Sequence, residues 1–138
     1  MKKNLYFTFI MLLVILIGLV FVTGCVPTLK PDLVPANPEG WAVFCDIDDS
    51  GNLVVHIKNQ GLAPAGSSHV KVDFGQYGES VKSVPALGVG DTTSVTVQFP
   101  SAANCFDPDC GFEITVDANE EINESNELNN SQIGNCIG

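Results

Sequence analysis

Short runs in which apolar and polar residues alternate recur along the chain after residue 32. In one of them Phe112, Ile114 and Val116 alternate with Glu113 and Thr115. Successive side chains of a β-strand point to opposite faces, so this spacing gives a strand with one apolar face. The same alternation recurs at 41–47, 53–57, 70–74 and 95–99, with Gly, Asn, Asp and Pro between the runs. The pattern predicts an all-β protein, an immunoglobulin-like β-sandwich of about seven strands, preceded by an N-terminal apolar signal helix.

Two further segments are predicted to be edge strands. Residues 32–35 end in Pro35, which has no N–H to donate to a central ladder. Residues 79–84 are mostly polar, which suits a strand with one neighbour and two wet faces. Residues 48–52, Asp-Asp-Ser-Gly-Asn, are predicted to form the turn of a hairpin between 41–47 and 53–57.

The N-terminus has the pattern of a lipoprotein signal peptide. Lys2 and Lys3 precede an uncharged apolar run over 5–22, and Thr23-Gly24-Cys25 completes a lipobox. We expect residues 1–24 to be the signal peptide, residues 25–31 to be a lipidated Cys25 with a Pro-containing tether, and residues 32–138 to be the sandwich. The domain would then be lipid-anchored at the cell membrane or outer envelope, on the extracytoplasmic side. The alternative is an uncleaved N-terminal anchor, because the run is nearly long enough to span a bilayer.

The cysteine count fits an exported protein. Five cysteines become an even set once Cys25 carries lipid, and an even set outside the cytoplasm predicts two disulfides. Of the three connectivities, the short loop from Cys105 to Cys110 around Pro108 favours a local bond, which pairs Cys45 with Cys136. The alternative is a zinc site of four thiolates, but the spacing lacks a C-x-x-C pair.

The charge of the chain excludes some partners. Two of the six Lys are Lys2 and Lys3, so the sequence after residue 24 has four Lys, no Arg and all sixteen Asp and Glu. Binding to nucleic acid is therefore not expected.

No catalytic set can be assembled from the predicted strands, so we expect a protein that is not an enzyme. His56 and His69 are predicted to be solvated surface residues. The serines, among them Ser67, Ser68, Ser94 and Ser125, are assigned to turns or outward positions without a base beside them. The carboxylates crowd one loop and lack the aromatic platform of a sugar cleft.

Three segments resemble the CARDB family, the cell-adhesion-related domain of bacterial and archaeal surface proteins. They are P-D-L-V at 31–34, N-Q-G-L-A-P-A-G at 59–66 and I-T-V-D-A-N-E-E-I-N-E-S-N-E-L-N-N at 114–130. The resemblance spans nearly all of the chain after the tether. It implies a binding or adhesion module for a protein or glycan partner. We expect no cofactor other than a possible calcium ion.

A calcium-dependent structural domain of the cell envelope is the competing interpretation. Calcium takes oxygen ligands from loops, and the segment after Val116 offers Asp117, Asn119, Glu121, Glu124 and Glu127. A solvated turn would have the same composition. Asp46-Ile47-Asp48-Asp49-Ser50-Gly51 also matches the start of a calcium loop, but Ile57 stands where the bidentate Glu is needed, so a plain turn is expected there.

Overall fold

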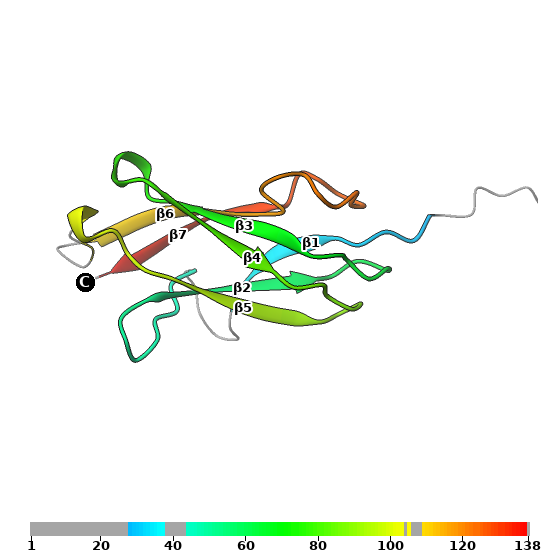
Figure 1. Cartoon of the computed structure of the whole chain (residues 1–138), viewed down its shortest axis with the longest axis horizontal. Helices are drawn as coiled ribbons and strands as arrows, with labels where there is room; N and C mark the ends of the chain where they lie inside the picture. The colour runs from blue at the N-terminus through cyan, green and yellow to red at the C-terminus, as the bar shows by residue number, and fades with distance from the viewer. Residues whose placement is uncertain (1–27, 38–43, 104, 106–108, 138) are drawn as a thin grey trace, which may run out of the picture.

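Two antiparallel sheets pack face to face in the computed structural model, which describes residues 28–37, 44–103, 105 and 109–137 (Figure 1). One sheet has the order β1-β2-β5, with β1 at Leu33–Ala36, β2 at Leu53–Asn59 and β5 at Thr92–Val97. The other has the order β4-β3-β6-β7, with β4 at Glu79–Val84, β3 at Ser68–Asp73, β6 at Asp109–Val116 and β7 at Ser131–Ile137. Two 3₁₀ turns, η1 at Gly75–Tyr77 and η2 at Ser101–Ala103, complete the described elements. The predicted all-β sandwich of seven strands is confirmed.

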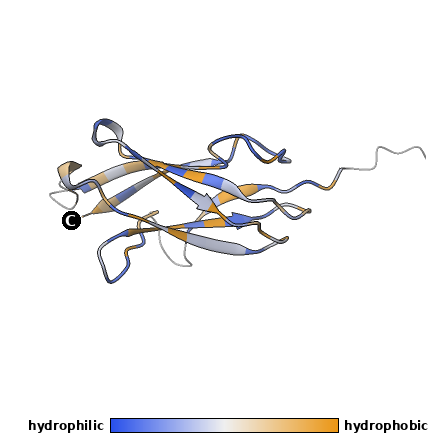
Figure 2. Cartoon of the chain, in the orientation of Figure 1, coloured by the Kyte–Doolittle hydropathy of each residue, from blue (hydrophilic) through white to orange (hydrophobic). Residues whose placement is uncertain are grey.

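Alternation along the strands produces the core. Leu53, Val55 and Ile57 of β2 are at most 1% exposed, and Val70 and Val72 of β3 are fully buried opposite them. Figure 2 shows hydrophobic residues interspersed with hydrophilic ones along the strands, whereas the loop between β6 and β7 is mostly hydrophilic. Each fully buried aliphatic side chain contributes about 1.5 to 3 kcal/mol relative to exposure, so this core supplies the main stabilisation of the sandwich.

Both predicted edge strands lie at edges. Among the strands that the structure describes, β1, which contains Pro35, pairs only with β2, and β4 pairs only with β3. In β4 only Val84 is buried. The polar composition that marked residues 79–84 as an edge therefore corresponds to a strand whose two faces are largely wet.

The predicted strand over 41–47 is only partly present. Trp41 and Val43 lie outside the described residues, and in the described remainder the pairing is a single bridge between Ile47 and Leu53. The turn after it forms as expected, because the Asp48 carboxylate accepts hydrogen bonds from the N–H groups of Ser50 and Asn52 at 2.9 Å. These bonds hold the pKa of Asp48 below its ordinary value, chiefly through Asn52. This loop is a hairpin turn, as the sequence analysis favoured.

Disulfides join Cys45 to Cys136 and Cys105 to Cys110. In the register of β6 and β7, Cys110 lies directly opposite Cys136. The first bond ties the segment before β2 to the other sheet, which explains why that segment does not continue along β2. The four cysteines thus meet at one end of the β6–β7 pair.

Residues 30–33, which lead into β1, lie between two loops and are hydrogen-bonded to both. The Lys30 carbonyl accepts from Leu62 N–H at 2.9 Å, and the Pro31 carbonyl accepts from Ser125 N–H at 2.9 Å. A Cβ on Gly61 would overlap the backbone of Pro31 and Asp32, so the close approach of these segments requires glycine there. The chain therefore enters the sandwich beside the β2–β3 and β6–β7 loops.

The predicted signal peptide and Cys25 lie outside the described residues. Within the described part of the chain, no helix has the length and apolar character needed to cross a membrane.

Candidate functional site at the loop between β6 and β7

The β6–β7 loop, residues 117–130, begins with a buried carboxylate in a left-handed conformation. Asp117 has φ 47° and is 3% exposed. Its two carboxylate oxygens accept from Glu121 N–H at 3.0 Å and from Ile122 N–H at 2.8 Å. Asp tolerates positive φ better than most residues and readily accepts bonds from nearby backbone, so it can both end the strand and fold the next turn back.

Glu124 is the second buried carboxylate of this loop, at 3% exposure. One oxygen accepts from Leu33 N–H of β1 and the other from the Asn130 side-chain amide at 3.0 Å. Burial raises the pKa of Glu124 to about 7, against the lowering effect of these two hydrogen bonds, and the negative charges of Glu127 and Asp117 add to the rise. The loop thus binds the first strand through a carboxylate that is costly to ionise.

Three of the five predicted ligands come together. One carboxylate oxygen each from Asp117, Glu124 and Glu127 lie within 4.8 Å of one another. The side-chain oxygens of Asn129 and Asn130 are buried without a hydrogen-bond partner, and the Asn130 amide touches Glu124. Because calcium needs several oxygens and each carboxylate oxygen keeps a second lone pair, the donor set suits a hard cation.

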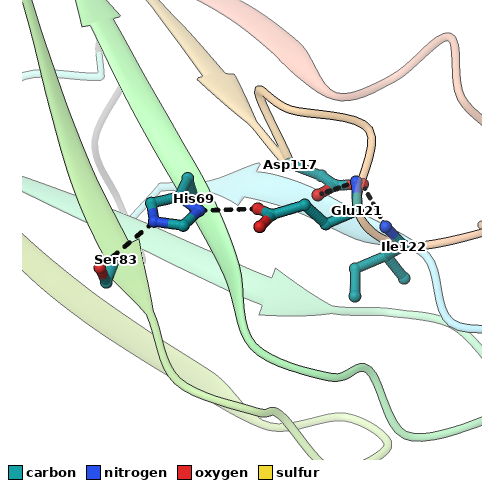
Figure 3. Close-up of polar contacts among 5 residues, drawn as sticks. All are labelled: His69, Ser83, Asp117, Glu121 and Ile122. Carbon is teal, nitrogen blue, oxygen red and sulfur yellow. Dashed lines mark hydrogen bonds and ion pairs between the residues drawn. The ribbon is translucent and has the colours of Figure 1, made fainter.

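The other two predicted ligands lie elsewhere. Asn119 is exposed, and Glu121 is outside the cluster because its Oε2 lies 2.7 Å from His69 Nδ1 (Figure 3). The interpretation of the whole loop as a solvated turn is wrong for Asp117 and Glu124, which are buried. Sequence composition alone gives no signal for which carboxylates turn inward.

An open pocket of about 630 Å³ adjoins the cluster. Its lining residues include Asp117, Glu120, Glu121 and Glu127, together with Leu128. The pocket is therefore acidic, with an aliphatic residue that is 94% exposed. Such a lining suits a cationic or hydrogen-bond-donating ligand.

His69 also approaches a serine, which the sequence analysis did not anticipate. Ser83 Oγ lies 3.4 Å from His69 Nε2, on the far side of the ring from Glu121 (Figure 3). A serine, a histidine and a carboxylate in this order resemble a nucleophile, its base and an orienting acid. However, Ser83 is exposed, the His69 and Glu121 side chains are 36% and 35% exposed, and neither His69 nor Ser83 lines the pocket. The arrangement therefore has the character of a surface hydrogen-bond chain.

Both histidines point outward as predicted, and both have carboxylate partners that were not predicted. His56 Nε2 lies 2.7 Å from Asp46 Oδ2, which ties β2 to the segment before it. Of the serines assigned to turns or outward positions, Ser68 was misassigned, since it is 2% exposed.

Comparisons with known proteins identify the fold independently. The profile of the CARDB family matches residues 30–133. A solution NMR structure of a domain of a candidate cell surface protein from Methanosarcina acetivorans has a TM-score of 0.61 and 22% identity, covering 79% of this chain and 92% of that one. The crystal structure of a CARDB domain from Pyrococcus furiosus, in complex with di-metal ions, has a TM-score of 0.57 and 22% identity, covering 78% and 93%. No curated protein matches the chain.

Proposed function

Because this chain belongs to the CARDB family, we propose that it is an extracytoplasmic lipoprotein, anchored through Cys25, whose sandwich is a non-catalytic binding or adhesion module for a protein or glycan partner. The family match over residues 30–133 is the observation that carries the proposal. The lipobox that ends at Cys25 supports the membrane anchor, and the two disulfides fit an oxidising compartment.

The anchor is tested by replacing the acceptor thiol. In cells given a labelled fatty acid, the wild-type chain should carry the label and lack its first 24 residues, whereas Cys25→Ser should lose the label and keep its N-terminus. Two or three acyl chains hold a protein firmly in a leaflet, since each buried methylene contributes about 0.8 kcal/mol. A wild-type chain that carries no lipid and begins at Met1 would instead be held by an uncleaved anchor.

Strand β7 offers a contact surface for a partner. Among the described strands it lies at an edge, it has no charged residue or proline, and Ile133 and Ile137 are 74% and 70% exposed on it. The other edge of this sheet, β4, carries Glu79 and Lys82, which oppose strand addition. An extended protein segment added beside β7 would gain backbone hydrogen bonds and apolar contacts.

Crosslinking in the native envelope tests this surface. We expect Ile133→Lys to abolish the crosslinked partner, because a charge on an exposed edge disfavours strand addition. The matched control is Val81→Lys on β4, whose side chain is 47% exposed, and it should leave the crosslink unchanged. Equal crosslinking by wild type and Ile133→Lys would place the partner elsewhere.

A calcium-dependent structural domain is the second candidate, favoured by the cluster of Asp117, Glu124 and Glu127. The CARDB domain from Pyrococcus furiosus was crystallised with di-metal ions, which is consistent with a metal at an acidic loop of this fold. If calcium binds here, it relieves the repulsion among three carboxylates. The melting temperature should then rise with the logarithm of the calcium concentration above the dissociation constant.

Neutralising the carboxylates tests this second candidate. The combined change of Glu124→Gln and Glu127→Gln should remove the calcium dependence, as should the set Glu121→Gln, Glu124→Gln and Glu127→Gln. Glu120→Gln is the matched control, because Glu120 lines the same pocket but is not in the cluster. A melting temperature that does not move at millimolar calcium eliminates this candidate and leaves the binding module.

A further inference from the structure

The segment that follows the lipidation site is fixed to one end of the sandwich. Lys30 Nζ donates to Asn123 Oδ1 at 2.5 Å and to the Glu124 carbonyl at 3.2 Å, so the side chain of the tether is held by the β6–β7 loop. The main chain is held as well, through Leu62 N–H to Lys30 and Ser125 N–H to Pro31. In Figure 1 the described residues before β1 lie at the end of the sandwich that carries this loop. The length of chain between the lipidation site and the sandwich is therefore set by the residues before Lys30.

Those residues are few. Cys25 precedes Lys30 by five positions, and five extended residues reach at most about 17 Å. The other end of the sandwich lies beyond the length of β6, whose eight residues extend about 25 Å. That end carries η1, which follows β3, and the turn at 48–52, which precedes β2.

We propose that the β6–β7 loop and its pocket face the lipid headgroups, while η1 and the turn at 48–52 point away from the membrane. The proposal rests on the lipid anchor of the proposed function, and it goes beyond that function by assigning a membrane-facing surface. The chain from Cys25 to Lys30 is shorter than the sandwich. The end that carries the β6–β7 loop therefore stays nearer the leaflet than the opposite end, unless the domain lies flat on the membrane.

The membrane-facing surface is acidic. Glu120, Glu121 and Glu127 are exposed on it, and the Lys30 ammonium is bound to Asn123 of the same loop. At physiological ionic strength the Debye length is about 8 Å, so the carboxylates of this surface interact only weakly with a charged headgroup layer at the distances that the tether allows. At low salt the Debye length is longer and the interaction is stronger. The surface therefore fits zwitterionic headgroups and is repelled by anionic ones.

Short-range fluorescence quenching tests the orientation in the full lipidated chain. A fluorophore is attached through an azide-bearing residue at Leu128 or Val89 beside the tether, or at Tyr77 or Ser50 at the opposite end, all of which are exposed. The protein is reconstituted in zwitterionic vesicles whose headgroups carry a spin label. We expect fluorescence to be lost at positions 128 and 89 and retained at 77 and 50. Anionic vesicles at low salt should weaken the loss at 128, and added salt should restore it.

The outcomes separate this proposal from the one on which it rests. Mass spectrometry of the same sample shows whether Cys25 is lipidated. Lipidated protein in which positions 77 and 50 are quenched as strongly as 128 and 89 overturns the orientation alone. Absence of lipid on Cys25 overturns the anchor and the orientation together. The same lipidated protein in vesicles without the spin label supplies the unquenched baseline for all four positions.

Discussion

Replacing Glu124 with Gln should change how the stability of the sandwich depends on pH. Glu124 is buried, accepts from Leu33 N–H and Asn130, and has a pKa raised to about 7 from 4.5. Gln has the same shape and no charge. Its amide can still accept from Leu33, and rotation of the Asn130 amide would present to it the oxygen that now lacks a partner. The substitution therefore isolates the cost of ionising residue 124.

The sign follows from the direction of the pKa change. A carboxyl with a higher pKa in the folded state favours folding when it is protonated, so its contribution is fully present below about pH 4.5 and is lost as pH rises through about 7. A difference of 2.5 pKa units (7 − 4.5) corresponds to about 3 kcal/mol at 1.36 kcal/mol per unit. Partial solvent screening reduces the expected change to about 1.5 to 3 kcal/mol.

Urea unfolding of wild type and Glu124→Gln between pH 4 and 9 measures this quantity. Other titrating groups affect both proteins alike, so the difference between their free energies of unfolding reports on residue 124. The variant should gain about 1.5 to 3 kcal/mol on wild type between pH 4 and pH 9, mostly between pH 5 and 7.5. A difference that stays within about 0.5 kcal/mol over the whole range would refute the argument that burial makes Glu124 costly to ionise.

Two further predictions concern covalent and hydrogen-bonded links. Peptide mapping without reduction should find Cys45 bound to Cys136 and Cys105 bound to Cys110, and loss of Cys136 should destabilise more than loss of Cys110, since closing a loop of 91 residues contributes about 4 to 5 kcal/mol in the chain-entropy model. A bond between Cys45 and Cys105 would contradict this pairing. Asn59→Ala should lower the free energy of unfolding by about 3 kcal/mol or more, because the fully buried Asn59 amide donates to Ala63, Leu87 and Gly88 and accepts from Asp32 and Gly61. Chemical denaturation measures the loss, and a cost below about 1 kcal/mol would show that water replaces these bonds.

The strands could be predicted because their signals are local. Alternation assigns the inward residues of β2, β3 and β6 without knowledge of their partners, and Pro35 identifies an edge through a missing donor. The bounds predicted for the polar edge strand, 79–84, agree with β4. In the segment before β2, the described residues 44–47 form a single bridge in place of the predicted strand, and Cys45 is bound to Cys136 of the opposite sheet, a link that alternation does not reveal.

The candidate site depends on contacts between distant residues, and its details could not be predicted. Asp, Asn and Glu identify the region as a polar loop. The choice of Asp117 and Glu124 as the buried carboxylates depends on the backbone path and on Leu33, which lies 91 positions before Glu124. Likewise, the sequence predicts a loop at Asn59, whereas in the structure this residue is the buried end of β2. Its side chain is hydrogen-bonded to three segments. In each case the partner that determines the role comes from elsewhere in the chain.

The bond between Cys45 and Cys136 has a mechanical consequence. Tension applied at residues 28 and 29 would act first on the hydrogen bonds that hold Lys30 and Pro31 to the two loops, and then on β1, which pairs with β2 over four positions. Once β1 detached, the chain could lengthen only as far as Cys45, about 45 Å from Asp32 when fully extended. The 91-residue loop closed by the disulfide would then carry the load covalently, with the remaining strands inside it. A module pulled from its N-terminal side would therefore lose β1 first. The other six strands would stay linked through the bond between Cys45 and Cys136.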